Sequence, residues 1–367
     1  MSTIGYEVCM LSTGANNPRN GEGTFIRLKD GGILYAYTMF VGNGWCDHDR
    51  ADIAGILSYD EGESWTEPHI LIAQDDESAN LMCPCFVRMN NGDIGLIYLR
   101  KYMEDAENQS GHYGGDPVLD NVLFVRSVDE GKTWSAPIDV TTAREFIGIE
   151  NDHAVMLQNG RIVIPANQHT TTENGKRNVS YHAKMFFIAS DDDGLTWKII
   201  SDEYDIPHPQ NSTTGLQETV IYQQNDGRIR ALSRTDRKCQ YETWSEDNCE
   251  TWSEIYPNVF FTSPESPLNM KRACGYTVAV WNPTPNYTGR VSACWGRTPL
   301  ALAVSENDGA SFDRLYYLED DPNNGYCYPS IFDGGDYLLV GYYHSAGTGM
   351  PLNANKIVKV LKSELQA

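Results

Sequence analysis

The sequence predicts an all-β protein: a six-bladed β-propeller of four-stranded antiparallel sheets, in a single domain over residues 1–367. Three observations lead to this prediction. One turn motif recurs along the whole chain, short hairpin patterns fill the intervals between its copies, and no segment shows a sustained helical period with caps. A repeat of this kind indicates one supersecondary unit used several times.

The repeated turn has the pattern S-x-D-x-G-x-[ST]-W, and its copies begin 55 to 69 residues apart. The five copies begin at Ser58, Ser127, Ser190, Ser245 and Ser305. Ser and Asp side chains can bond to the backbone of a tight turn, and glycine supplies a positive φ. The aromatic residue can pack between neighbouring sheets. The fourth copy has Cys249 for glycine, and the fifth has Asn307 for Asp and Phe312 for Trp. We expect these turns to be scaffold.

Between the turns, the chain alternates short β-type runs with glycine turns, the strongest short-range hairpin signal. Such hairpins are expected at 25–37, 85–98, 154–164, 219–232 and 330–340. Two hairpins in each interval of about 60 residues give four strands per repeat. A chain of 367 residues then holds about six repeats, with the sixth shared between the two termini. A closed ring of such sheets protects their edges.

Composition excludes several classes of function. The net charge of −22 argues against a general nucleic-acid or anionic-membrane surface, and no apolar run has the length of a membrane span. The nine cysteines are odd in number and scattered, which favours buried thiols over a metal site, and no cofactor is expected. No secretory signal is visible, so we expect a cytoplasmic protein, or a secreted one if a leader has been removed.

Tyr328, in Gly-Tyr-Cys-Tyr-Pro-Ser-Ile, and Glu218, in Gly-Leu-Gln-Glu-Thr-Val, enter inner strands of different repeats. With the repeated turns, these segments resemble the sialidase (neuraminidase) superfamily and its BNR or Asp-box repeats, from Arg19 to Tyr343. The resemblance implies that Tyr328 is the nucleophile and Glu218 its base. The family uses a phenol because the anomeric carbon of the substrate bears a carboxylate. A phenol with a pKa near 10 needs such a base.

The resemblance also implies an arginine cluster that binds the substrate carboxylate. Arg234 is similar in place to the second arginine of the cluster, with Arg237 as a neighbouring alternative, and Arg297 is similar to the third. Guanidinium suits this role because its planar fork binds a carboxylate bidentately and keeps its charge.

The first arginine of the cluster departs from the family pattern. Gly21 stands where the arginine of the Arg-Ile-Pro motif belongs. Either Arg19 reaches the same place from the preceding loop, or Glu22 enters the pocket and only two arginines bind the carboxylate.

The general acid/base of the family is an aspartate shortly before the first turn motif. Asp47 matches it best, ahead of Asp49 and Asp52. To donate a proton near neutral pH, this carboxyl needs a raised pKa.

A second polar cluster, Glu150-Asn151-Asp152-His153 with His169, has no clear family counterpart. Asp152 and His153 either recognise sugar hydroxyls in a pocket wall or bond to the backbone of their own loop. The segment 101–120, in the longest repeat interval, is a candidate pocket rim.

These residues predict a retaining exo-glycosidase that hydrolyses terminal sialic acid or a related anionic sugar from glycans, without a metal. The partner is then a small-molecule or glycan substrate, not a nucleic acid or a membrane. One alternative is a different sugar, uronic or neutral, with Glu218 and Asp47 as the working carboxyl pair. Another is a glycan-binding propeller that has lost catalysis.

Overall fold

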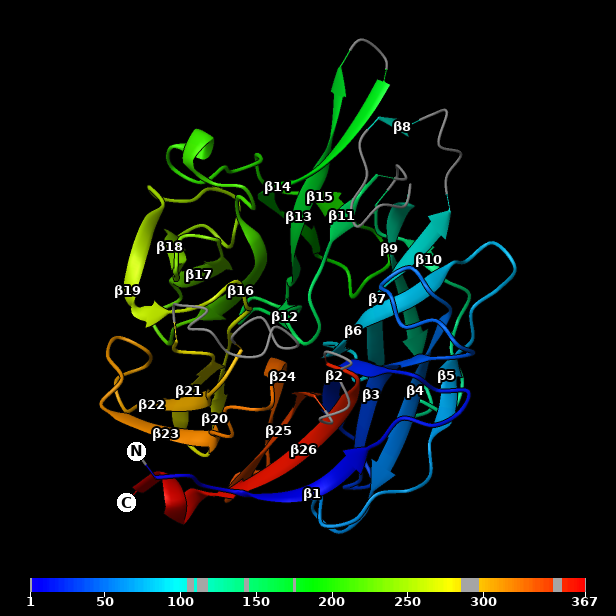
Figure 1. The fold of residues 1–367 in the computed structure, drawn as a ribbon, viewed down its shortest axis with the longest axis vertical. Helices are drawn as coiled ribbons and strands as arrows, with labels where there is room; N and C mark the ends of the chain where they lie inside the picture. Colours follow the sequence, from blue (N-terminus) through cyan, green and yellow to red (C-terminus); the bar gives the residue numbers. More distant parts are fainter. Residues whose placement is uncertain are drawn as a thin grey trace.

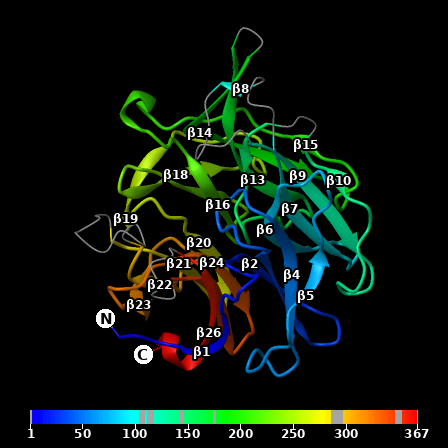
Figure 2. The same ribbon diagram turned by 45° about the vertical axis from the view of Figure 1, so that its right-hand side comes forward.

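The computed structural model describes residues 2–103, 109–110, 118–141, 145–173, 176–284, 297–345 and 352–366. Six antiparallel sheets are arranged radially around a central axis, and each forms one blade of a propeller (Figures 1 and 2). The predicted fold class is confirmed. Of the described residues, only η2 (Pro209–Asn211) and η4 (Lys362–Gln366) are helical, and neither has the length or apolar character to cross a membrane.

The first three blades follow one another along the chain. Blade 1 contains β2 (Asn20–Arg27), β3 (Ile33–Phe40), β4 (Ala51–Ser58) and β5 (His69–Ile72). Blade 2 contains β6 (Asn80–Arg88), β7 (Ile94–Met103), β9 (Val118–Ser127) and β10 (Ile138–Asp139). Blade 3 contains β11 (Ile147–Gly148), β12 (Val155–Met156), β13 (Ile162–Glu173), β14 (Lys176–Ser190) and β15 (Lys198–Ile199), and β8 (Gln109–Ser110) pairs with β14.

The other three blades complete the ring. Blade 4 contains β16 (Gln217–Gln223), β17 (Ile229–Arg234), β18 (Cys239–Ser245) and β19 (Tyr256–Thr262). Blade 5 contains β20 (Asn269–Ala273), β21 (Tyr276–Trp281), β22 (Leu300–Ser305) and β23 (Arg314–Glu319). Blade 6 contains β24 (Tyr326–Asp333), β25 (Tyr337–His344), β26 (Ala354–Leu361) and β1 (Tyr6–Leu11).

The two ends of the chain close the ring together. β1 pairs antiparallel with β26, with Tyr6 opposite Lys359 and Leu11 opposite Asn355. Blade 6 therefore takes three strands from the C-terminal end and its outermost strand from the N-terminal end (Figure 1). This confirms the predicted sharing of the last repeat.

All five turn motifs form the same hydrogen-bonded scaffold. In the third copy, Ser190 Oγ donates to Asp192 Oδ1 at 2.8 Å and accepts from the Gly194 amide at 2.8 Å. Asp192 also accepts from the Thr196 amide at 2.8 Å and from its hydroxyl at 2.6 Å. In the altered copies, Cys249 adopts a φ of 74°, and Asn307 Oδ1 still accepts the backbone amide of residue 311.

The aromatic residue after each turn packs between blades, as predicted. Trp252 follows β18 of blade 4 and stacks on Phe187 of blade 3, with ring centroids 4.4 Å apart. Trp197 of blade 3 likewise contacts Phe124 of blade 2, with ring centroids 5.4 Å apart. Apolar side chains therefore fill the spaces between neighbouring sheets.

A buried carboxylate, that of Asp152, connects several blades at the axis. The inner position of blade 3 is split between β11 and β12, and Asp152 lies in the loop between them. Its Oδ1 accepts from Thr24 Oγ1 at 2.8 Å and faces Lys271 Nζ at 2.6 Å. Its Oδ2 accepts from Asn269 Nδ2 at 3.0 Å and from the Ile331 amide at 2.9 Å. One side chain of blade 3 thus binds blades 1, 5 and 6.

The hydrogen bonds of the third turn motif predict that two substitutions of Asp192 lower stability by different amounts. Asp192→Ala removes an acceptor that holds three groups of the turn, so we expect the free energy of unfolding to fall by about 1–3 kcal/mol. Asp192→Asn should cost less, because Asn307 fills the same place in the fifth copy. Urea unfolding of both variants checks this order, and equal losses would contradict it.

The axial carboxylate predicts a larger loss. Asp152→Asn removes the partner of Lys271 and turns an amide nitrogen toward buried donors, so we expect the free energy of unfolding to fall by roughly 2–5 kcal/mol. The control is Asp202→Asn at an exposed position, which should leave stability unchanged. Thermal and urea unfolding provide the comparison. Similar midpoints for the two variants would show that Asp152 does not hold the blades together.

Candidate active site

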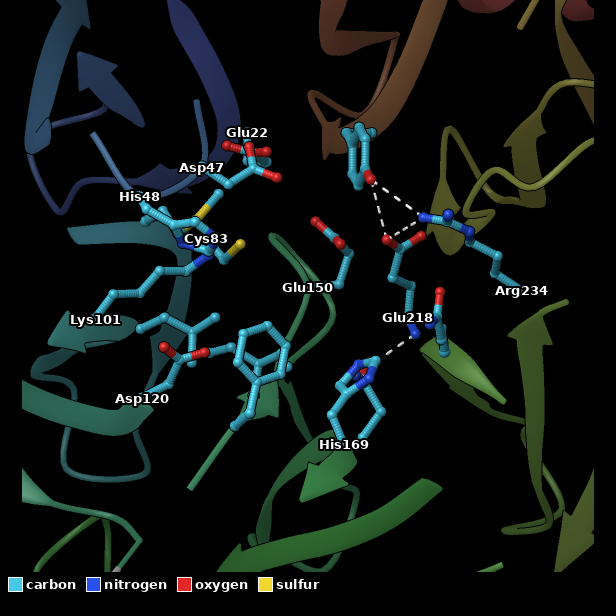
Figure 3. Close-up of a pocket in the computed structure, with 18 of the residues that line it drawn as sticks. Glu22, Asp47, His48, Cys83, Lys101, Asp120, Glu150, His169, Glu218 and Arg234 are labelled. Atoms are coloured by element: carbon cyan, nitrogen blue, oxygen red, sulfur yellow. Dashed lines mark hydrogen bonds and ion pairs between the residues drawn. The ribbon is translucent and has the colours of Figure 1, made fainter. Parts of the chain in front are cut away.

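A pocket of about 460 Å³ opens at the propeller axis, and residues of all six blades line it. It brings together most of the residues singled out in the sequence. These are Arg19, Glu22, Asp47, Glu218, Arg234, Arg297 and Tyr328. In the view of Figure 3, Glu22, Asp47, Lys101 and Asp120 lie on one side of the pocket, Glu218 and Arg234 lie on the other, and Glu150 lies between them.

Irregularities in the inner strands aim side chains into this pocket. The pairing register shifts at residues 21–23 of β2, 82–85 of β6, 217–220 of β16 and 327–330 of β24. Within these bulges, Cys83, Glu218 and Tyr328 have positive φ values of 56°, 47° and 56°. Non-glycine residues rarely adopt this conformation, and bulges commonly re-aim a side chain beside an active site.

Tyr328, Glu218 and Arg234 form a hydrogen-bonded group in the pocket. Glu218 and Arg234 lie on the same side of it (Figure 3). The Tyr328 hydroxyl donates to Glu218 Oε1 at 3.0 Å. Arg234 Nη1 donates to the same carboxylate oxygen and approaches the Tyr328 hydroxyl at 3.3 Å. Burial and the charge of Glu218 raise the pKa of Tyr328 well above its usual value, and the nearby arginines only partly offset this. The phenol is therefore neutral and in contact with a base.

Arg297 flanks the same phenol from blade 5. Its Cζ lies 5.3 Å from the centre of the Tyr328 ring, a cation–π distance. Its Nη2 and Nε donate to the backbone oxygen of Glu265 at 2.8 and 3.2 Å, and its Nη1 approaches Cys327 Sγ at 3.3 Å. One guanidinium group therefore lies beside the Tyr328 ring and another, that of Arg234, beside its hydroxyl.

Arg19 reaches the pocket from the loop before β2 and contacts two carboxyl groups. Its Nη1 donates to Asp47 Oδ1 at 2.5 Å, and its Nη2 lies 3.4 Å from Glu22 Oε1. Its Nε donates to the Tyr343 hydroxyl at 2.7 Å. Both alternatives for the place of the first arginine are therefore present together: Arg19 enters from the loop, and Glu22 also lines the pocket.

Asp47 differs from the expectation of a raised pKa. Its side chain is 49% exposed; desolvation of the carboxyl favours the neutral form, but the charges of Arg19 and Lys101 outweigh it and hold its pKa below the usual range. This carboxyl is therefore ionised and paired with Arg19.

Blade 3 contributes Glu150 and His169 to the pocket wall. Burial and the charges of Glu218 and Glu22 raise the pKa of Glu150 well above its usual value. His169 Nδ1 lies 2.9 Å from the Ser180 oxygen, so it donates there, and its Nε2 accepts from an amide nitrogen at 2.9 Å. Burial lowers the pKa of His169 to about 4, which keeps it neutral.

The remaining candidates lie outside the pocket lining. Asp152 binds the inner strands, as described above, and His153 Nδ1 lies 3.1 Å from the Thr219 oxygen. Asp49 accepts from the Cys46 amide at 2.7 Å within its own loop. Arg237 is exposed and donates to the Asn211 oxygen at 2.5 Å.

Lys101 and Asp120, at the ends of the candidate rim, also line the pocket, and sequence reasoning assigned them no role. Lys101 in β7 pairs with Asp120 in β9. A charged residue within an apolar strand is the sequence signal that could have identified each of them. Burial raises the pKa of Asp120 to about 7, against the opposing charge of Lys101. Residues 104–108 and 111–117 of the rim lie outside the described residues. No group of metal-ligating side chains occurs in the described part of the chain.

Known proteins with similar sequences include sialidases. A sialidase of Paraclostridium sordellii is 27% identical over 62% of this chain and 55% of its own length. A sialidase of Bacteroides fragilis is 20% identical over 92% of this chain and 62% of its own length. The chain therefore spans little more than half of these relatives.

Solved structures share the fold. A Dyadobacter fermentans protein of unknown function superposes with a TM-score of 0.74 at 18% identity, over 97% of this chain and 98% of that one. An intramolecular trans-sialidase of Ruminococcus gnavus has a TM-score of 0.72 at 14% identity, over 98% of both chains. The family model described as a BNR repeat-like domain matches residues 13–344. With this match over most of its length, the chain belongs to the BNR repeat-like domain family, as a sialidase-like propeller.

Proposed function

We propose that this chain is a retaining exo-glycosidase of sialidase type, acting on terminal sialic acid or a related anionic sugar. The main support is the Tyr328 phenol, hydrogen-bonded to Glu218 at 3.0 Å and flanked by Arg234 and Arg297 inside the axial pocket. A binding site has no need of a phenol in contact with a base. The sialidases among the sequence relatives support the same class of reaction.

In the first step, the Tyr328 oxygen attacks the anomeric carbon and its proton passes to Glu218. The bond from the anomeric carbon to the leaving oxygen breaks, and Asp47 protonates that oxygen. In the second step, water gives a proton to Asp47 and attacks the same carbon. The bond to Tyr328 then breaks, and Glu218 returns the proton to the phenol. Two displacements at one carbon retain its configuration.

Asp47 must gain a proton before it can act as an acid. The charges of Arg19 and Lys101 hold its pKa low. A sugar carboxylate held by Arg234 and Arg297 adds a negative charge to the pocket, and this charge raises the pKa of Asp47. Substrate binding and protonation of Asp47 are then coupled.

A second candidate keeps the scaffold and changes the sugar. Glu22 lines the pocket near the place of the first arginine in the family, which favours a sugar with fewer negative groups, uronic or neutral. Glu218 and Asp47 then act as the carboxyl pair.

The proposal predicts which side chains turnover requires. Tyr328→Phe removes the nucleophile, and Asp47→Ala removes the acid, so each should lower kcat for a fluorogenic sialoside by about 10²-fold or more. Arg234→Ala should also lose activity, whereas Arg237→Ala, outside the pocket, should retain it. Undiminished turnover by Tyr328→Phe would refute the mechanism, and release from a uronide but not a sialoside would favour the second candidate.

The pocket also predicts a pH dependence. Because burial raises the pKa of Asp120 to about 7, this carboxyl is neutral below that pH and charged above it. The added negative charge should weaken binding of an anionic sugar, so KM should rise as the pH increases through about 7. Asp120→Asn should remove this rise. Steady-state kinetics from pH 5 to 9 provide the test, and an unchanged profile in the variant would exclude Asp120 as its source.

A further inference from the structure

Glu22 is a buried acidic side chain that the proposed mechanism does not use. It lies in the bulge of β2, lines the pocket, and is only 3% exposed. Its Oε1 is 3.4 Å from Arg19 Nη2, and its Oε2 is buried without a hydrogen-bond partner. A buried carboxylate oxygen without a partner costs free energy, so it calls for an explanation.

The backbone on both sides of Glu22 is held tightly. A Cβ on Gly21 would lie 1.7 Å from the Tyr343 hydroxyl, and one on Gly23 would lie 2.1 Å from the Tyr35 hydroxyl. Both positions therefore require glycine, because the tyrosine hydroxyls occupy the space that a Cβ would need. The two tyrosines leave residue 22 little freedom to turn away from the pocket, so its carboxyl is fixed in place before a ligand arrives.

The surroundings of Glu22 favour a ligand group that donates hydrogen bonds. The pocket also contains Glu218, whose Oε2 atom is likewise buried without a hydrogen-bond partner. An acceptor such as a ligand carboxylate would leave these oxygens without a donor. A hydroxyl or amino group would relieve this shortage, because it gives a donor to an oxygen that has none.

We propose that Glu22 is a specificity-determining residue whose Oε2 accepts a hydrogen bond from a hydroxyl or amino group of the bound sugar. The substrate class is then a sugar whose carboxylate is held by Arg234 and Arg297 and which presents a donor to blade 1. This inference rests on the proposed role of the pocket in sugar binding.

Calorimetric titration of the full chain tests the inference without relying on turnover. The probes are methyl glycosides of N-acetylneuraminic acid, of neuraminic acid with its free amine, and of glucuronic acid. Glu22→Leu should weaken binding of the best probe about tenfold or more. Weaker binding of the N-acetylated probe than of the free amine identifies an amino donor, and equal binding of the two identifies a hydroxyl. Undiminished binding by Glu22→Leu overturns the proposal.

Thermal unfolding supplies a second readout. Removing a buried oxygen that has no partner should leave the Tm of Glu22→Leu unchanged or higher. The matched control is Glu242→Leu, outside the pocket, where the buried carboxyl pairs with Arg230 at 2.9 Å and its loss should lower the Tm. Equal losses in both variants would make Glu22 structural and overturn the inference. If no probe binds the native chain, the proposed function fails, while the Tm comparison still decides the role of Glu22.

Discussion

The structure depends on polar contacts at the propeller axis, where the inner strands of six sheets meet. Asp152 contributes bonds to three other blades, and its own amide donates to the Pro84 oxygen of a fourth at 3.3 Å. His153, next in the chain, faces the Thr219 oxygen of blade 4. The loop between β11 and β12 of blade 3 thus contacts each of the other five blades.

Acidic and basic side chains of the pocket pair with one another. Four basic residues line the pocket against six acidic ones, so the described lining has no excess of basic side chains. Arg19 pairs with Asp47 and Arg234 with Glu218, so both arginines already have a carboxyl partner within the pocket. A ligand must therefore exchange partners within a network, which ties affinity to the protonation of the carboxyls.

Local signals were sufficient to predict the fold, because each turn motif and hairpin is decided within about ten residues of sequence. The pocket was harder to predict from the sequence. Tyr328 and Glu218 were found through resemblance, whereas the bulges that aim them depend on register, which a short motif does not encode. Asp152 was taken for a possible ligand contact because its partners lie more than 100 residues away in the chain. Lys101 and Asp120 were missed for a similar reason, since only cross-strand pairing brings them together.

The closing strand β1 has a consequence for biosynthesis. β1 leaves the ribosome long before its partner β26 is made, because the other blades lie between them in the chain. During translation, both β1 and the growing edge of the propeller remain without a neighbour, and such edges invite pairing with other chains. The ring is sealed only once the C-terminal strand has emerged, so a chain truncated before residue 354 leaves the N-terminal strand without its place in the ring.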